Sequence, residues 1–144
     1  MPVKPYQVVL DTNVLVTAAR SRRGTSYALL RTLRAGQWQM NISPALFLEY
    51  EAQLKIEAMR QNRPLAAVDR FLDLLARISI RREVYFLLRP FLRDSKDDFI
   101  IELAVASRAD YLVTWNVRDF AGAEEYGIAV MRPNEFLAML ENPS

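Results

Sequence analysis

Carboxylate and amide side chains recur in this 144-residue chain where predicted strands end or predicted helices begin. In a parallel sheet such positions meet at one edge, outside the carboxyl ends of the strands. Carboxylates gathered at one place repel each other, so they need a cation between them. The candidates are Asp11, Glu49, the cluster of Asp94, Asp97 and Asp98, and the pair of Asn116 and Asp119.

The residue types that the chain lacks narrow the chemistry. It has no histidine and no cysteine, which excludes disulfides, metal ligation by either residue and every Ser-His or Cys-His mechanism. Oxygen ligands alone select Mg²⁺ or Mn²⁺. Two such ions held a few ångströms apart can activate a water and stabilise the leaving oxygen of a phosphodiester. The acids therefore predict metal-dependent hydrolysis of phosphodiester bonds.

Each acid taken singly also has an ordinary structural interpretation. Asp11 can cap the helix that follows it, and Glu49 can be a solvated residue of a helix surface. Asp97 or Asp98 can complement a helix dipole, and Asp119 can cap a turn. The joint order of the acids at strand ends, and not any one of them, favours the metal site.

The composition is that of a globular domain with an uneven distribution of charge. Hydrophobic residues make up 51% and charged residues 25% of the chain, and the net charge is +2. Residues 1–48 hold six basic side chains against the single acid Asp11, and arginine far outnumbers lysine. The planar guanidinium suits phosphate oxygens, which favours a nucleic-acid partner, but solvated faces explain the arginines equally well.

Short apolar strands alternate with helices along the chain. We expect strands over 7–10, 39–42, 78–80, 111–114 and 128–131. Helices are expected from near Val14, from Thr25 or Ser26 to about Ala35, from Pro44 to about Arg60, from Pro64 over an apolar face at 65–75, from Asp97 or Asp98 to Ser107, and over 133–140. Residues 20–24 should form a basic loop, and 81–93 are ambiguous because a proline interrupts them. This alternation predicts one domain, 1–144, with helices on both faces of a parallel sheet.

The order of these motifs resembles that of PIN-domain proteins, of the kind known as toxins of prokaryotic toxin–antitoxin pairs. The resemblance rests on the strand and Asp-Thr-Asn of 8–13, the Ser-to-Glu-Tyr helix of 42–50, the Asp-rich helix start of 93–104, the strand and Asn-x-x-Asp-Phe turn of 109–120, and the tail 133–137. It implies a three-layer α/β/α fold with a short, mostly parallel sheet of about five strands, and a ribonuclease that depends on Mg²⁺ or Mn²⁺.

The resemblance also implies roles for single residues. Asp11, Glu49 and Asp97 match the three core acids, as catalytic residues and metal ligands. Many relatives have Asp where this chain has Asn116, which keeps a carbonyl oxygen but loses a charge, so Asp119 is expected to complete the catalytic set. The second-tier candidates are Asp94, Asp98, Asn13 and Thr114, the last matching a hydroxyl that helps to order the acids in relatives.

Three functions compete at this point. The leading hypothesis is an Mg²⁺-dependent endoribonuclease in which a metal-activated water attacks phosphorus, with Arg20, Arg22 and Arg23 holding RNA phosphates. Asn116 favours a second hypothesis, a catalytically weak module that binds RNA or protein. A DNA nuclease ranks last, because the chain lacks extra helical domains to grip duplex DNA.

Partners and location follow from the resemblance and from hydropathy. The resemblance implies a cognate antitoxin protein and a homodimer, with apolar contact candidates at Phe71, Leu72 and Leu75 and in the 86–88 run. We find no signal peptide and no apolar run of about 20 residues that would span a membrane. The expected location is the cytoplasm.

Overall fold

The chain folds around a five-stranded sheet. The structure is a computed structural model and describes residues 4–84 and 98–142. Its strands are β1 (Tyr6–Leu10), β2 (Trp38–Ile42), β3 (Ile80–Arg81), β4 (Tyr111–Val113) and β5 (Ala129–Met131). They lie in the order β3-β2-β1-β4-β5, and all neighbouring pairs are parallel. The expectation of a parallel sheet of about five strands is confirmed.

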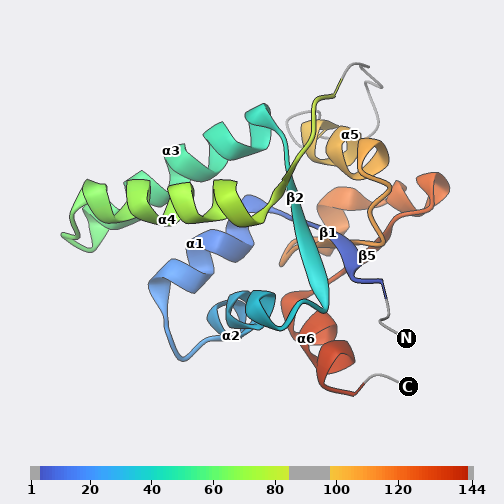
Figure 1. Cartoon of the computed structure of the whole chain (residues 1–144), viewed down its shortest axis with the longest axis horizontal. Helices are drawn as coiled ribbons and strands as arrows, with labels where there is room; N and C mark the ends of the chain where they lie inside the picture. Colours follow the sequence, from blue (N-terminus) through green and yellow to red (C-terminus); the bar gives the residue numbers. More distant parts are fainter. Residues whose placement is uncertain (1–3, 85–97, 143–144) are drawn as a thin grey trace.

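Helices cover both faces of this sheet. Those of the described residues are α1 (Thr12–Arg20), α2 (Thr25–Arg31), α3 (Pro44–Arg60), α4 (Leu65–Ile78), α5 (Asp98–Ala106) and α6 (Pro133–Glu141). Short 3₁₀ helices are η1 (Thr32–Ala35), η3 (Val117–Phe120) and η4 (Ala123–Tyr126). Figure 1 shows α5 on one side of the strands and α2 with α6 on the other, which gives the expected three-layer α/β/α arrangement.

An aromatic cluster fills the space between the sheet and α6. The Phe136 ring packs against Trp38 and Tyr111, with 5.6 Å between ring centroids in each pair, and Tyr6 packs edge-on against Tyr111. The buried indole N–H of Trp38 donates to the hydroxyl of Thr32 at 2.8 Å. Because side chains alternate along a strand, the residues beside Trp38 on β2 point to the opposite face, where α5 lies.

Local capping explains where the two helices nearest the acids begin. The Ser43 hydroxyl accepts a hydrogen bond from the Leu46 N–H at 3.2 Å, and Pro44 occupies the first helical position. The Asp11 carboxylate accepts from the Thr12 N–H at 2.8 Å, so α1 begins two residues earlier than the expected start near Val14. The predicted bounds of α3 are confirmed.

Two other boundaries differ from the prediction. The strand expected over 78–80 begins only at Ile80, because Ile78 ends α4 and the Ser79 N–H still donates to the Leu75 carbonyl. The helix expected to run to Ala35 ends at Arg31 and continues as η1, which tightens the last turn before Gly36 at φ 77°. Neither Thr25 nor Ser26 caps this helix, since its N-cap is Gly24.

Part of the predicted map lies outside the described residues. This holds for Asp94, Asp97, the 86–88 run and most of the ambiguous 81–93 segment. Among the helices that the structure describes, we find none with the length and apolar character needed to cross a membrane.

Candidate functional site

Asp11 lies at the centre of the candidate site. It follows β1 directly, and its N–H donates to the Val113 carbonyl at 2.9 Å, which fixes it beside the end of β4. Its side chain is only 8% exposed. One carboxylate oxygen accepts from the Thr12 N–H and the other from the Thr114 hydroxyl at 2.7 Å. Each carboxylate oxygen has two lone pairs, so both oxygens can still accept one further ligand.

The surroundings of Asp11 raise the pKa of its carboxyl group above the ordinary value. Burial is the largest cause, and the negative charges of Asp119 and Glu49 add to it, while the hydrogen bonds from Thr114 and Thr12 act in the opposite direction. The structure therefore brings Asp11, Glu49 and Asp119 close enough for their charges to interact, although they lie directly after β1, on α3 and on η3.

The other predicted acids have different environments. Asn116 and Asp119 are exposed at the start of η3, Glu49 is half-buried on α3, and Asp98 is fully buried as the first residue of α5. Within residues 4–84 and 98–142, no three acidic side chains lie close enough to hold a metal ion by themselves. The predicted core acid Asp97 lies outside those ranges.

Thr114 connects the start of α1 with the segment that follows β4. Its hydroxyl donates to Asp11 and accepts from the Asn116 N–H at 3.0 Å and from the Asn13 amide at 3.4 Å. The side-chain carbonyl oxygen of Asn13 accepts in turn from the backbone N–H of Trp115 at 3.2 Å. These bonds join the start of α1 to the segment after β4 and give Asn13 and Thr114 defined contacts in the site.

Trp115 is a residue that sequence reasoning missed. Its indole N–H donates to the hydroxyls of Thr17 and Ser26 at 3.1 and 2.9 Å, and these two hydroxyls are 2.6 Å apart. The cluster holds the backbone just before Asn116 against α1 and α2. A large aromatic residue in a polar turn directly after a strand was the available signal.

Tyr50 holds the backbone directly before Asp11. It is fully buried on α3, and its hydroxyl donates to the Leu10 carbonyl at 2.6 Å, one residue before Asp11. Burial raises the pKa of the Tyr50 hydroxyl well above its ordinary value, and the negative charge of Asp11 contributes. Tyr50 therefore stays protonated and keeps donating over any physiological pH.

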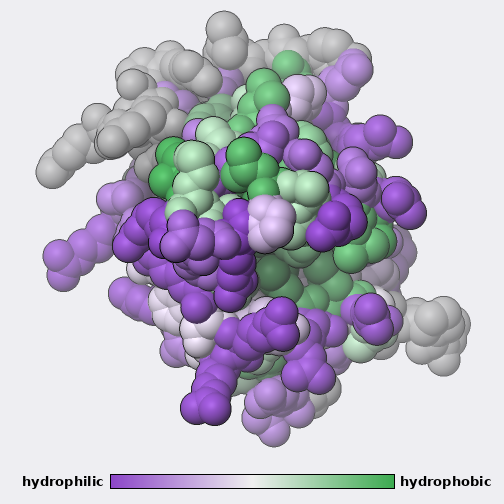
Figure 2. Space-filling view, turned by 90° about the vertical axis from the view of Figure 1, so that its left-hand side faces the viewer, coloured by the Kyte–Doolittle hydropathy of each residue, from purple (hydrophilic) through white to green (hydrophobic). Residues whose placement is uncertain are grey.

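The predicted RNA-binding arginines lie away from the acids. Arg20 ends α1, about 13 Å from Asp11 along the helix axis. Its guanidinium pairs with the buried carboxylate of Glu57 at 2.6 Å, whereas Arg22 and Arg23 are exposed in the following turn. Figure 2 faces this end of the molecule and shows hydrophilic side chains around smaller hydrophobic areas. The structure thus does not bring these arginines together with the acids.

Comparison with known families agrees with the fold. A family model described as PIN domain matches residues 7–118, and the chain belongs to this family. PIN domains are generally nucleases and typically use divalent metal ions. A search of curated proteins found none that matches the chain.

Proposed function

We propose that this protein is a metal-dependent endoribonuclease and the toxin of a toxin–antitoxin pair. The observation that carries the proposal is Asp11, a buried carboxylate at the carboxyl end of a central strand, held by two hydrogen bonds and repelled by two other acids. Burial of repelling carboxylates is costly unless a cation binds among them. Such an arrangement is typical of a site that is completed by a ligand.

The donors fit a hard divalent ion. They are oxygen atoms only, and both Asp11 oxygens keep a lone pair for a ligand. We propose Asp11, Glu49 and Asp97 as the holding residues, with Asn116 or Asp119 as the fourth. When bound, Mg²⁺ or Mn²⁺ would supply positive charge that polarises a phosphodiester and lowers the pKa of a water. Thr114 and Tyr50 keep Asp11 oriented, and Thr114 also favours its ionised form.

RNA cleavage in the presence and absence of a chelator tests this proposal. We expect cleavage of single-stranded RNA with Mg²⁺ or Mn²⁺ and none with excess chelator, because the site then lacks its cation. Activity that the chelator leaves unchanged would contradict the proposal. Heat-treated protein and protein from a parallel preparation of a catalytic variant control for contaminating nucleases.

A second function is favoured by Asn116, which lacks the charge of an acid at this position and is exposed. In this alternative the protein binds RNA or protein without useful catalysis. It requires RNA binding that is insensitive to metal and no turnover at high protein concentration. Asn116→Asp distinguishes the two, because added charge should increase the metal-dependent rate of an enzyme and leave a binding module inactive.

The proposed partners are an antitoxin and a second copy of the chain. The earlier apolar candidates Leu72 and Leu75 are wrong as contact residues, because they are 3% and 2% exposed in the core of this chain. Large exposed hydrophobic residues do occur on α3 and α4, and they are Leu48, Ile56, Met59, Leu65, Leu74 and Ile78. We propose that the second copy of the chain contacts this α3–α4 surface. We also propose that a cationic side chain of the antitoxin binds among the acids of the site in place of the metal.

Light scattering checks the proposed dimer. At micromolar concentration we expect twice the chain mass of 16.6 kDa, and Ile56→Asp should shift the mass to that of one chain, since a buried carboxylate opposes the contact. The variant should melt like the parent when the monomer is intact. Ala66→Asp, an exposed position on the first turn of α4, is the matched control. A parent that remains a single chain at every concentration would contradict the dimer.

A further inference from the structure

A row of side-chain amides joins the neighbouring strands β1 and β2 on the face opposite to the aromatic cluster. The Arg82 Nε–H donates to the Asn41 carbonyl oxygen at 3.0 Å, and the Asn41 amide donates to the Gln7 carbonyl oxygen at 3.0 Å. The Gln7 amide donates to the Gln39 carbonyl oxygen at 2.7 Å. Gln7 and Gln39 are direct partners in the register of β1 and β2. The row thus runs from Arg82 to Gln39.

The guanidinium of Arg82 sets the direction of the whole row. A guanidinium can only donate, so the oxygen of Asn41 must face it and the nitrogen of Asn41 must face Gln7. By the same reasoning the nitrogen of the Gln7 side chain must face Gln39. The Asn41 NH₂ also donates to the backbone carbonyls of Val8 and Gln39, which agrees with this orientation. The group left over at the far end is the NH₂ of Gln39, which is a donor.

The leftover donor belongs to Gln39, which lines a cavity together with the cationic side chains of Lys4 and Arg108. The cavity has a volume of about 520 Å³ and lies at the amino-terminal ends of the strands, lined by Lys4, Pro5, Tyr6, Gln7, Gln39, Arg108 and Asp110. In the described part of the chain, no carboxylate forms an ion pair with Lys4 or Arg108. Among the described residues of the lining, Asp110 is the one acid, and one of its oxygens already accepts from the Gln7 N–H at 2.7 Å. Donor groups therefore outnumber acceptor groups among the charged and amide side chains of this lining.

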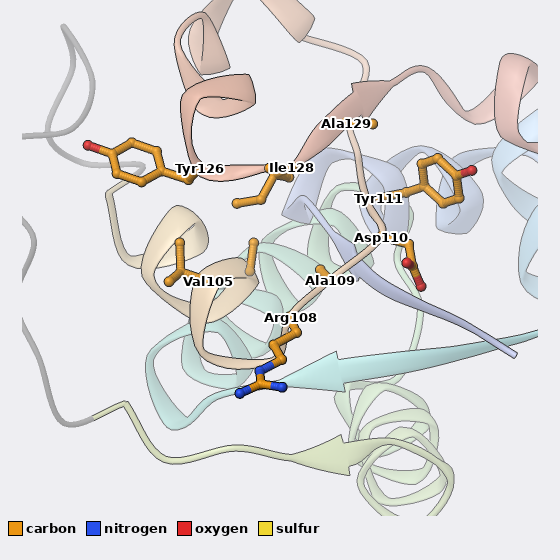
Figure 3. A pocket seen from close by; sticks show the side chains of 10 residues that line it. Val105, Arg108, Ala109, Asp110, Tyr111, Tyr126, Ile128 and Ala129 are labelled. Carbon is orange, nitrogen blue, oxygen red and sulfur yellow. The ribbon is translucent and has the colours of Figure 1, made fainter. Parts of the chain in front are cut away.

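Arg108 has an unfavourable backbone conformation for its residue type. It follows α5 with φ 53°, in the left-handed region where glycine is preferred. It also borders an adjoining cavity of about 470 Å³, whose walls include the apolar side chains of Val105 and Ile128. Figure 3 shows the Arg108 guanidinium turned away from Ile128 and Tyr126, so its charge is directed out of the adjoining cavity. Arg108 therefore lines both the donor-rich cavity and the adjoining cavity, whose walls are partly polar and partly apolar.

We propose that this edge of the sheet binds a nucleotide. Its phosphate lies in the donor-rich cavity with Gln39, Lys4 and Arg108, and its base lies against Val105 in the adjoining cavity. Asp110 lines both cavities and offers an acceptor to a ribose hydroxyl between them. The site is separated from Asp11 by the length of β1, about 16 Å.

The nucleotide can be free or part of an RNA strand, and only the second source depends on the proposed ribonuclease function. Calorimetry with the full chain in chelator, at constant ionic strength, should show binding of AMP. Inorganic phosphate should compete with AMP because it occupies the same donors. A short single-stranded RNA that also competes assigns the site to the RNA strand, and AMP binding without RNA competition assigns it to free nucleotides.

Gln39→Glu is the sharpest variant because it has the same shape and still accepts from Gln7. It replaces the leftover donor with a negatively charged acceptor, so AMP affinity should fall by at least about tenfold. Asn41→Asp acts from within the sheet. Its two oxygens face Arg82 and Gln7, so Gln7 and then Gln39 must turn over and present an acceptor to the cavity. We expect a comparable loss of affinity from this variant.

Arg108→Gly separates a binding role from a capping role. Glycine relieves the left-handed backbone, so the melting temperature should rise while AMP affinity falls several-fold, on the order of one phosphate contact. Arg34→Ala, which removes an exposed arginine from η1, should change neither quantity. Asp11→Asn should bind AMP like the parent, which keeps this test independent of cleavage. Parent protein that binds no AMP, or Gln39→Glu that binds within about twofold of the parent, would overturn the proposal.

Discussion

Asp11→Asn should abolish metal-dependent RNA cleavage and at the same time raise the melting temperature in chelator. The loss of cleavage is expected to reach about a thousandfold or more, because the central carboxylate of the site no longer carries a charge for the cation. The gain in stability follows from removing one of several repelling acids that is also buried. The asparagine has the same shape, and its oxygen can still accept from either the Thr12 N–H or the Thr114 hydroxyl, so the fold should persist.

The pH dependence of this stability has a definite sign. Because the pKa of Asp11 is raised in the folded protein, its ionisation opposes folding. The metal-free parent should therefore lose stability relative to the variant as the pH rises from the ordinary value of 3.8 through the raised pKa, and the difference should then stay constant. Below pH 3.8, where Asp11 is protonated in both the folded and the unfolded parent, its ionisation should cause little difference in stability between the two proteins.

Thermal melts of parent and variant across this range, in chelator, measure the effect. Asp73→Asn on the exposed surface of α4 is the matched control and should melt like the parent at every pH. Wild-type turnover in Asp11→Asn would remove Asp11 from the site. A variant that melts below the parent at neutral pH would show that repulsion and burial do not dominate at this position.

Thr114→Val should have the second largest effect, on both stability and activity. The substitution removes a buried hydroxyl that donates to Asp11 and accepts from the Asn116 N–H and the Asn13 amide. Buried groups without partners cost about 1–3 kcal/mol each, so we expect the free energy of unfolding to fall by roughly 2–4 kcal/mol. Cleavage should fall by about tenfold to a hundredfold, the usual cost of losing a hydrogen bond to a metal ligand.

The pH profile distinguishes a role in the site from a purely structural one. The Thr114 hydrogen bond lowers the pKa of Asp11, so its loss should raise that pKa further. The acidic limb of the cleavage profile should move to higher pH in Thr114→Val. Thr114→Ser keeps the hydroxyl and should restore both the position of the limb and most of the stability. An unchanged limb in Thr114→Val would show that Thr114 acts only on the fold.

Much of the fold could be predicted because its signals are local. An apolar run ending at Asp11 predicts a buried strand followed by a cap, and Ser43-Pro44 predicts the start of α3 within one residue. The order of acids at strand ends predicts their approach, because parallel strands align their carboxyl ends at one edge. The interaction of Asp11 with Glu49 and Asp119 agrees with that prediction.

The errors at element ends have a related cause. Nothing in the residue types around Ile78 separates the last turn of a helix from the start of a strand, because Ile suits both and the boundary depends on a single hydrogen bond to Leu75. The helix after Gly24 likewise tightens into a 3₁₀ turn through contacts that periodicity does not encode. The apolar face of α4 predicted that its residues are buried. It did not show that they are buried in the core of the same chain and not against a second copy.

The sequence by itself determined the alternation of strands and helices, the parallel sheet and the edge at which the acids gather, since these follow from periodicity and from short capping motifs. Only the tertiary structure decided which partners each polar group has. Thr114 reaches Asp11 across 103 residues, Trp115 finds hydroxyls on two different helices, and Arg82 orients amides on β1 and β2. Hydrogen bonds depend on distance and direction in space, and residues so far apart in the chain meet only once the whole sheet has formed.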